Sequence, residues 1–142
     1  MRALLDVNVL IALLDADHVH HAAATAWLEK NLKSGWASCP ITQNGCIRIL
    51  SQPGYPHPLP AAQVTQRLAE AASSTHHEFW PDRVSILDKN VIDPTHLLGS
   101  RQVTDAYLLA LAVANKGCLL TFDRSVSLLA VAGAEKKHLH VL

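Results

Sequence analysis

The amino-acid sequence predicts an α/β fold in which a mainly parallel sheet is covered by helices on both faces. Short apolar runs that are typical of buried strands alternate with longer segments whose apolar residues recur every three or four positions. A strand, a crossover helix and a second parallel strand join in a right-handed sense in nearly all known cases. The alternation therefore favours successive right-handed βαβ units.

The first half of the chain is expected to hold three strands and four helices. Glycine at Gly35, proline at Pro40 and a loop at 52–58 that holds three prolines mark breaks between the periodic segments. In chain order we expect a strand at 2–5, helices at 9–14 and 20–32, a strand at 36–39, helices at 42–50 and 60–72, and a strand at 77–80.

In the second half, residues 84–98 have a mixed pattern of apolar and polar residues, from which we predict neither a helix nor a strand. Residues 103–114, VTDAYLLALAVA, are strongly helical, and Gly117 suits the position just beyond a helix end. We expect a buried strand at 118–122, a short helix at 126–131 and a closing strand at 138–142. No repeat, low-complexity segment or linker appears, so residues 1–142 are expected to form one domain.

The composition excludes several classes of protein. Of 142 residues 49% are hydrophobic, and twelve Lys and Arg balance twelve Asp and Glu, so no overall positive field attracts a polyanion. Cys39, Cys46 and Cys118 form no C-x-x-C pair and are expected to be buried as small apolar residues. Asp6 interrupts the first apolar run, and no later run approaches the roughly 18 to 20 residues of a membrane span. We expect a cytoplasmic protein without membrane contact.

Three aspartates stand where chemistry is expected in such a fold. Asp6 and Asp123 follow predicted strands, and Asp105 lies in the first turn of an apolar helix. Ligands of open α/β sheets bind beyond the carboxyl ends of the strands. Carboxylates crowded there repel each other unless a cation compensates them, and magnesium or manganese prefers such oxygen ligands. Each aspartate also has a local interpretation, as a helix cap, a turn residue or a charge favoured by the helix dipole.

Three segments resemble a known family. The opening LLDVNVLIALLDADHVHHAAATAWL, the segment CPITQNGCIRILSQPGYP and the segment LLGSRQVTDAYLLALAVANKGCLLTFDRSV are similar in order and spacing to PIN-domain ribonuclease toxins of the VapC type. The resemblance covers nearly the whole chain, and residues 101–123 are its most specific part. It implies a three-layer α/β/α fold and a magnesium-dependent endoribonuclease, with manganese as a substitute. It also implies a homodimer and inhibition by a VapB-type antitoxin.

The resemblance also implies the site. Asp6, Asp105 and Asp123 match three metal-binding acids of the family, and Asn8 and Thr121 match its supporting polar residues. One departure concerns the third-helix motif: aligning its apolar-Thr start with residues 41–42 puts the family's glutamate at Gly45. The site is then short of one negative charge, which should weaken cation binding. The amide oxygen of Gln43 or Asn44 is the available replacement.

Other residues have two interpretations each. Arg101 and Arg124 flank the acidic positions and can bind RNA phosphates or remain solvated at the surface. The histidines at 18, 20 and 21 lack a clear ligand set, so a surface or helix-packing role is expected rather than a metal cluster. The tryptophans at 27, 36 and 80 lie in apolar segments, which favours packing over base stacking.

The combined hypothesis is a toxin of a type II toxin–antitoxin system that cleaves structured RNA, with tRNA or ribosomal RNA loops as the substrate class that the resemblance implies. The missing glutamate motivates a different class, a degenerate PIN domain that binds RNA or antitoxin without cleavage. A metal-dependent phosphatase on a similar sheet is the third hypothesis.

Overall fold

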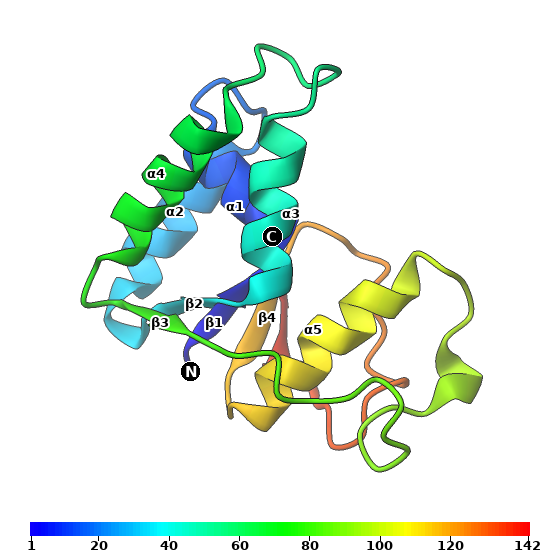
Figure 1. Ribbon diagram of the computed structural model, residues 1–142. Coiled ribbons are helices and arrows are strands. Elements are labelled where there is room, and N and C mark those ends of the chain that lie inside the picture. The colour runs from blue at the N-terminus through cyan, green and yellow to red at the C-terminus, as the bar shows by residue number, and fades with distance from the viewer.

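The computed structural model describes residues 1–142 and contains a five-stranded parallel sheet (Figure 1). The strand order is β3-β2-β1-β4-β5, and every neighbouring pair is parallel. The strands are β1 (Ala3–Leu5), β2 (Trp36–Ser38), β3 (His77–Phe79), β4 (Cys118–Thr121) and β5 (Leu139–Val141). The predicted parallel sheet is thus confirmed.

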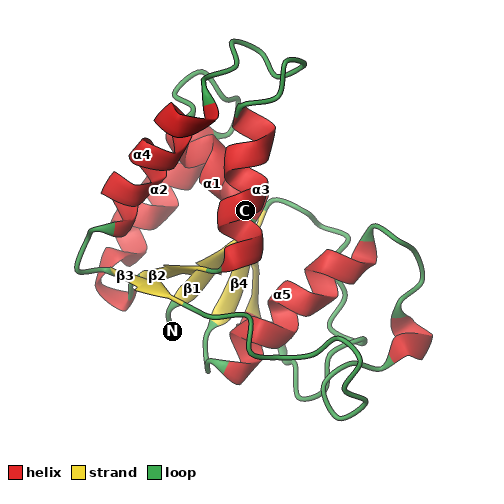
Figure 2. Ribbon diagram, viewed as in Figure 1, coloured by secondary structure: helices red, strands yellow, loops and turns green.

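Helices cover both faces of this sheet, which gives the predicted three layers (Figure 2). One face carries α1 (Val7–Leu14), α2 (His21–Asn31), α3 (Pro40–Leu50) and α4 (Ala61–Ala72), and the other carries α5 (Gln102–Ala114). Short 3-10 helices lie at Leu32–Ser34, Pro94–His96 and Lys136–His138.

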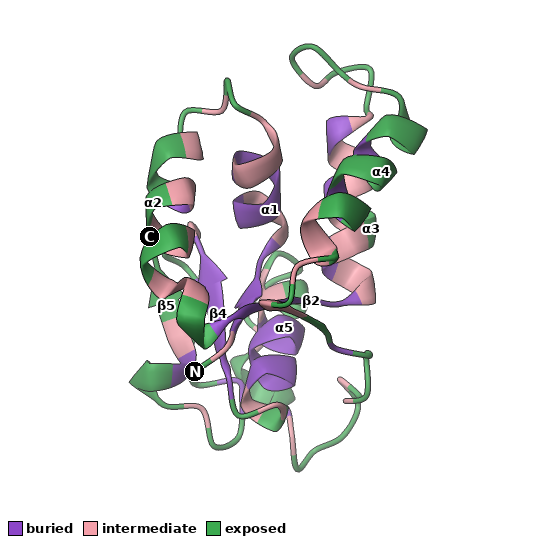
Figure 3. Ribbon diagram, turned by 90° about the vertical axis from the view of Figure 1, so that its left-hand side faces the viewer, coloured by how far each residue is buried: buried purple, intermediate pink, exposed green.

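The core is divided in two by the sheet, as the alternation of strand side chains requires. Leu5 and Leu120 belong to the cluster under α1 to α4, whereas Leu4 and Leu119 pack with α5 on the other face. The central strands β1 and β4 and most of α5 are therefore buried (Figure 3). All three cysteines are buried and free, which confirms their expected role.

Most predicted elements are present, with shifts at their ends that capping explains. Helix α1 begins two residues earlier than expected because the Asp6 carboxylate accepts a hydrogen bond from the Val7 amide and caps it. Helix α3 begins at Pro40 rather than at Thr42, whose hydroxyl instead accepts from the Cys39 amide at 3.0 Å.

The predicted helix at 126–131 is wrong. Residues 126–131 form turns and a β-bridge, in which Val131 pairs antiparallel with Ile92. The carbonyl of Ala130 accepts a hydrogen bond from the Asp93 amide at 2.9 Å. This segment therefore forms its backbone hydrogen bond with the loop at 91–93 and not within a helix. Burial of Val126, Ala130 and Val131 produced the apolar spacing that was interpreted as a helix.

No helix of the structure is both long and apolar enough to cross a membrane.

Helices α1 and α3 approach each other closely at Gly45. A Cβ atom at this position would lie 2.6 Å from Cγ2 of Val7, a stiff β-branched side chain. Glycine is unfavourable inside a helix by about 1 kcal/mol relative to alanine, so its presence here is explained by the helix contact. This contact holds the middle of α3 against Val7, the residue that follows Asp6.

We predict that Gly45→Ala destabilises the parent protein by up to about 2 kcal/mol, because an overpacking cost of roughly 1 to 3 kcal/mol exceeds the gain in helix propensity. In a Val7→Ala background the clash is gone, and the same substitution should become neutral or stabilising. Urea unfolding of the four proteins checks this. An equal cost in both backgrounds would contradict the contact.

Candidate active site

The three predicted acids meet at the carboxyl edge of the sheet. Asp6 follows β1 and is 7% exposed, Asp123 follows the neighbouring strand β4, and Asp105 lies in the first turn of α5 on the opposite face from α1. Burial, followed by the negative charges of Asp6 and Asp123, raises the pKa of Asp105 to about 6. The sheet thus brings together side chains that lie up to 117 positions apart in the sequence (123 minus 6).

The hydroxyl of Thr121 connects the residues of this edge. Thr121 is fully buried, and its Oγ1 donates to Oδ2 of Asp6 at 2.7 Å. The same oxygen accepts from Nδ2 of Asn8 at 3.2 Å and from the amide of Asp123 at 3.0 Å. One donated and two accepted bonds use the full capacity of a hydroxyl group. Both supporting positions implied by the resemblance therefore contact the site.

The carboxylates differ in their surroundings. Burial is the main cause that raises the pKa of Asp6, against the opposing hydrogen bonds from Thr121 and Val7. Asp123 behaves in the opposite way, since bonds from the hydroxyl and the amide of Ser125 lower its pKa. The proximity of Asp105 and Asp123 raises the pKa of Asp105 and helps to lower that of Asp123. A proton held at this edge therefore resides on Asp105 rather than on Asp123.

No basic side chain neutralises these acids. The ion pairs of the structure join Arg2 to Glu78, His96 to Asp93 and Lys137 to Glu135, and none of them includes Asp6, Asp105 or Asp123. Hard carboxylate oxygens without a protein counter-ion are the donor set that a magnesium or manganese ion prefers. In their present rotamers, no three His, Cys, Asp or Glu side chains converge closely enough to hold an ion. The donor chemistry nevertheless fits a divalent cation, which can be held by one or two carboxylates together with water.

Gln43 is the position on α3 that is best prepared to replace the missing glutamate. Its Nε2 donates to Oγ of Ser38 at 2.9 Å, and that oxygen lies 2.8 Å from Nε2 of His77. The amide is anchored by its nitrogen, and its oxygen has no hydrogen-bond partner in the protein. Asn44 is exposed, and Gly45 has no space for a side chain beside Val7. The structure thus argues against Gly45 as a position for a carboxylate.

The two candidate phosphate-binding residues have side chains without a polar partner in the protein. Arg101 directly precedes α5 and Arg124 directly follows Asp123, and both are exposed. Neither side chain takes part in a hydrogen bond or an ion pair with the protein. Their positions beside the acids are compatible with contacts to phosphate groups.

The histidines and tryptophans mostly have the packing roles that the sequence favoured. His21 Nδ1 lies 2.7 Å from the carbonyl of Ala12, which joins α2 to α1, and Trp36 and Trp80 are buried. His20 is different, because its exposed ring stacks on Phe122, the residue before Asp123.

Sequence reasoning missed Phe122 and Ser125, which lie next to Asp123 in the chain, and Ser38 and His77, which form the hydrogen-bond chain of Gln43. Ser38 and His77 carry no recognisable spacing in the sequence, because they meet Gln43 through contacts between separate elements. The sequence Asp123-Arg124-Ser125 did contain a signal for Ser125, since aspartate commonly accepts hydrogen bonds from the residue two positions later.

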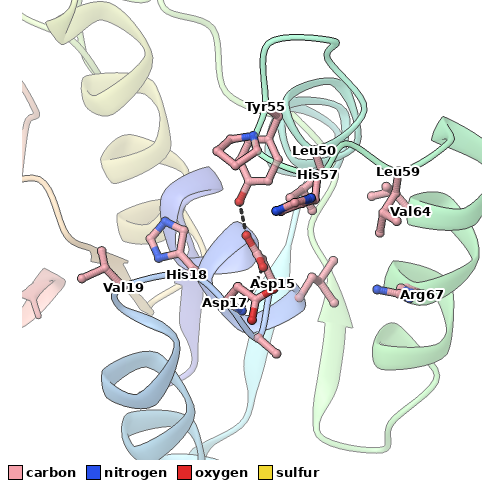
Figure 4. A pocket seen from close by; sticks show the side chains of 13 residues that line it. Asp15, Asp17, His18, Val19, Leu50, Tyr55, His57, Leu59, Val64 and Arg67 are labelled. Carbon is pink, nitrogen blue, oxygen red and sulfur yellow. Dashed lines mark hydrogen bonds between the residues drawn. The ribbon is translucent and has the colours of Figure 1, made fainter.

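The largest cavity is separate from the acids, at the other end of α1 (Figure 4). Its volume is about 560 Å³, and its apolar wall includes Leu14, Leu50 and Val64. Asp15, which accepts a hydrogen bond from Tyr55, faces this cavity together with His57 and Arg67. Active sites are commonly found in the largest pocket of an enzyme, but in this protein the three carboxylates lie outside that pocket.

Comparison with known proteins agrees with this arrangement of strands and helices. Residues 3–132 match the family model described as PIN domain. Ribonuclease VapC44 of Mycobacterium tuberculosis (strain ATCC 25618 / H37Rv) is 58% identical over 142 residues, which cover 100% of both chains. Ribonuclease VapC39 of the same strain is 44% identical over 135 residues, covering 94% of this chain and 96% of that protein.

A solved structure has the same fold. The crystal structure of VapBC2 from Rickettsia felis, bound to a DNA fragment from their promoter, contains a chain that aligns with a TM-score of 0.61. The alignment covers 87% of this chain and 89% of that chain at 16% identity, so it bears on the fold alone. The family model and the full-length relatives together place this chain in the PIN-domain family, among its VapC-type members.

Proposed function

We propose that this protein is the toxin of a type II toxin–antitoxin system and acts as a metal-dependent endoribonuclease. The observation that carries the proposal is the group of three aspartates at one sheet edge, which no basic side chain neutralises and in which the pKa of Asp105 is raised to about 6. The proposal is further supported by relatives that are named ribonucleases and match the full length of the chain.

Each acid has a role in this mechanism. Asp6 and Asp105 would hold the principal cation, for which we propose magnesium with manganese as a substitute. Asp123, whose pKa is lowered by Ser125, stays ionised and would orient the attacking water. The ion would contribute Lewis-acid chemistry, lowering the pKa of bound water and offsetting the charge of the phosphate. Thr121 and Asn8 keep Asp6 and Asp123 in place, and Gln43 adds an amide oxygen.

The substrate that we propose is a structured RNA, with tRNA or ribosomal RNA loops as the class. The chain is electroneutral overall, so affinity for RNA must come from local contacts. Arg101 and Arg124 provide two exposed guanidinium groups on either side of the acids. Each can bind a phosphate of the strand that passes the site.

A second candidate function has a specific observation in its favour. Helix α3 contributes no carboxylate to the sheet edge, so the domain could bind RNA or antitoxin without cleavage. Cleavage assays on RNA with magnesium, manganese and chelator separate the two functions. A small phosphomonoester in the same assay tests the phosphatase hypothesis.

We also propose a VapB-type antitoxin as the partner and a homodimer as the solution state. The C-terminal segment of the antitoxin would reach the acidic site, where a basic side chain can supply the missing positive charge. Light scattering should report a mass of at least two chains at micromolar concentration. A single-chain mass would contradict the homodimer.

We predict that Asp105→Asn lowers RNA cleavage at least about a hundredfold, the scale of losing one key electrostatic contact. The fold should survive. The carboxyl of Asp105 has its pKa raised from the ordinary 3.8 to about 6, so folding opposes its ionisation. This cost is absent below pH 4 and fully present above pH 6. In chelator, melting temperatures should therefore fall less for the variant than for the parent as pH rises from 4 to 7.

The matched control is Glu29→Gln, which removes an exposed carboxylate on α2 that forms no ion pair. It should leave cleavage and the response to metal unchanged. Full cleavage by well-folded Asp105→Asn protein would overturn the metal-nuclease mechanism.

We predict that Gln43→Glu tightens manganese binding by about 1 kcal/mol, roughly fivefold in Kd, because it adds a partly exposed charge to the site. Calorimetric titration or manganese electron paramagnetic resonance measures the change. Gln63→Glu, an exposed change on α4, is the control and should have no effect. If the Gln43 variant folds and binds manganese no better than the parent, Gln43 does not face the ion.

A further inference from the structure

Three rings form a row that begins beside the acids. The ring of His20 lies on the ring of Phe122 with 4.5 Å between centroids and 19° between planes, a stacked arrangement. The ring of His18 follows at 5.7 Å from His20, tilted by 43°. Phe122 joins the last residue of β4 to Asp123, so the row starts at the acidic edge.

The inner ring of this row, Phe122, is held firmly, and its middle ring, His20, is accessible. The amide of Phe122 donates to Oδ1 of Asn8 at 3.2 Å, and its ring packs against the core cluster under α1 to α4. His20 is exposed although its ring covers that of Phe122. The Nδ1 atom of His18 accepts from the amide of His20 at 3.0 Å, which stabilises the turn before α2. An aromatic surface thus stands at the acidic site and faces solvent.

The row also leads to the largest cavity, because His18 is one of its lining residues (Figure 4). The cavity combines an apolar wall with groups that can bind polar edges, among them His57 and the guanidinium of Arg67. Its volume of about 560 Å³ lies within the usual range for small-molecule sites and is ample for one nucleobase. His57 has a φ of 54°, a left-handed conformation that is uncommon outside glycine. Such conformations often occur at ligand sites.

We propose that this row is a nucleobase subsite that leads the RNA strand from the acids to the cavity: one base stacks on His20, and the next nucleotide enters the cavity past His18. Base stacking on aromatic side chains is independent of sequence and needs no net positive charge, which suits an electroneutral chain. Single-stranded loops, whose bases are free to turn outward, are the form of RNA that such a surface accepts.

The inference rests on the proposed function, since it takes RNA as the ligand. Its test uses Asp105→Asn protein, which binds without cutting, and short single-stranded RNAs that carry 2-aminopurine at one position each. Fluorescence anisotropy gives affinity at fixed salt, and 2-aminopurine emission reports stacking. His20→Ala should weaken binding roughly 5- to 100-fold, the range for one lost base–aromatic stack, and abolish the emission change at one position.

Two further variants separate stacking from other roles. His20→Phe keeps an aromatic face without a charge and should restore both affinity and the emission change. His140→Ala is the matched control, because His140 is also exposed and lies against a ring, that of Trp27, but it pairs with Leu120 on β4 and is not part of the row of rings. Leu59→Trp partly fills the cavity and should abolish the emission change at the neighbouring position only.

The outcomes distinguish the two proposals. Parental affinity in His20→Ala, or no recovery in His20→Phe, overturns the stacking subsite, and an unchanged second position in Leu59→Trp overturns the path to the cavity. Manganese affinity should be the same in all His20 variants, which excludes damage to the acids. If the parent fails to cut RNA while binding still depends on the ring at position 20, the nuclease proposal fails and the subsite stands.

Discussion

The site depends on one buried hydroxyl group. Thr121 Oγ1 bonds to the carboxylate of Asp6 just after β1, to Asn8 in the first turn of α1 and to the amide of Asp123 just after β4. It thereby holds Asp6 and Asp123 at adjacent strand ends although their charges repel. A valine of the same shape would leave the buried Oδ2 of Asp6 without its donor, at a cost of about 1 to 3 kcal/mol, and would remove the acceptor of two half-buried donors.

The carboxylates around Thr121 are not neutralised by basic side chains of the protein. Asp6 is buried, the pKa of Asp105 is raised to about 6, and the ion pairs of the chain lie elsewhere. Such a site costs stability in the metal-free state and favours a ligand that brings positive charge. The same property would favour both the catalytic cation and the basic antitoxin segment that we propose, and the two would compete for the same carboxylates.

The absence of a glutamate on α3 changes which groups can surround a cation at this site. The close contact between Gly45 and Val7 excludes a side chain there, whereas Gln43 is tied through its nitrogen to Ser38 and keeps its oxygen free. In the proposed metal site, α3 would therefore contribute the neutral amide of Gln43 instead of a carboxylate at position 45, with a weaker attraction for the ion. The aromatic row at His20 would act on the RNA and not on the metal ion, because it can stack on a base however tightly the ion is bound.

The sequence by itself determined the order of strands and helices, the parallel sheet and the three aspartates, because apolar periodicity and the acid at a strand end are local features. It misassigned 126–131, where burial comes from pairing with Ile92 rather than from a helix face. Only the tertiary structure decided which partners each group finds: the Thr121 bonds, the Gly45 contact, the Ser38 anchor of Gln43 and the stack of His20 on Phe122. The physical reason is that these contacts join residues from different strands, helices and loops, and their distances depend on how the layers pack.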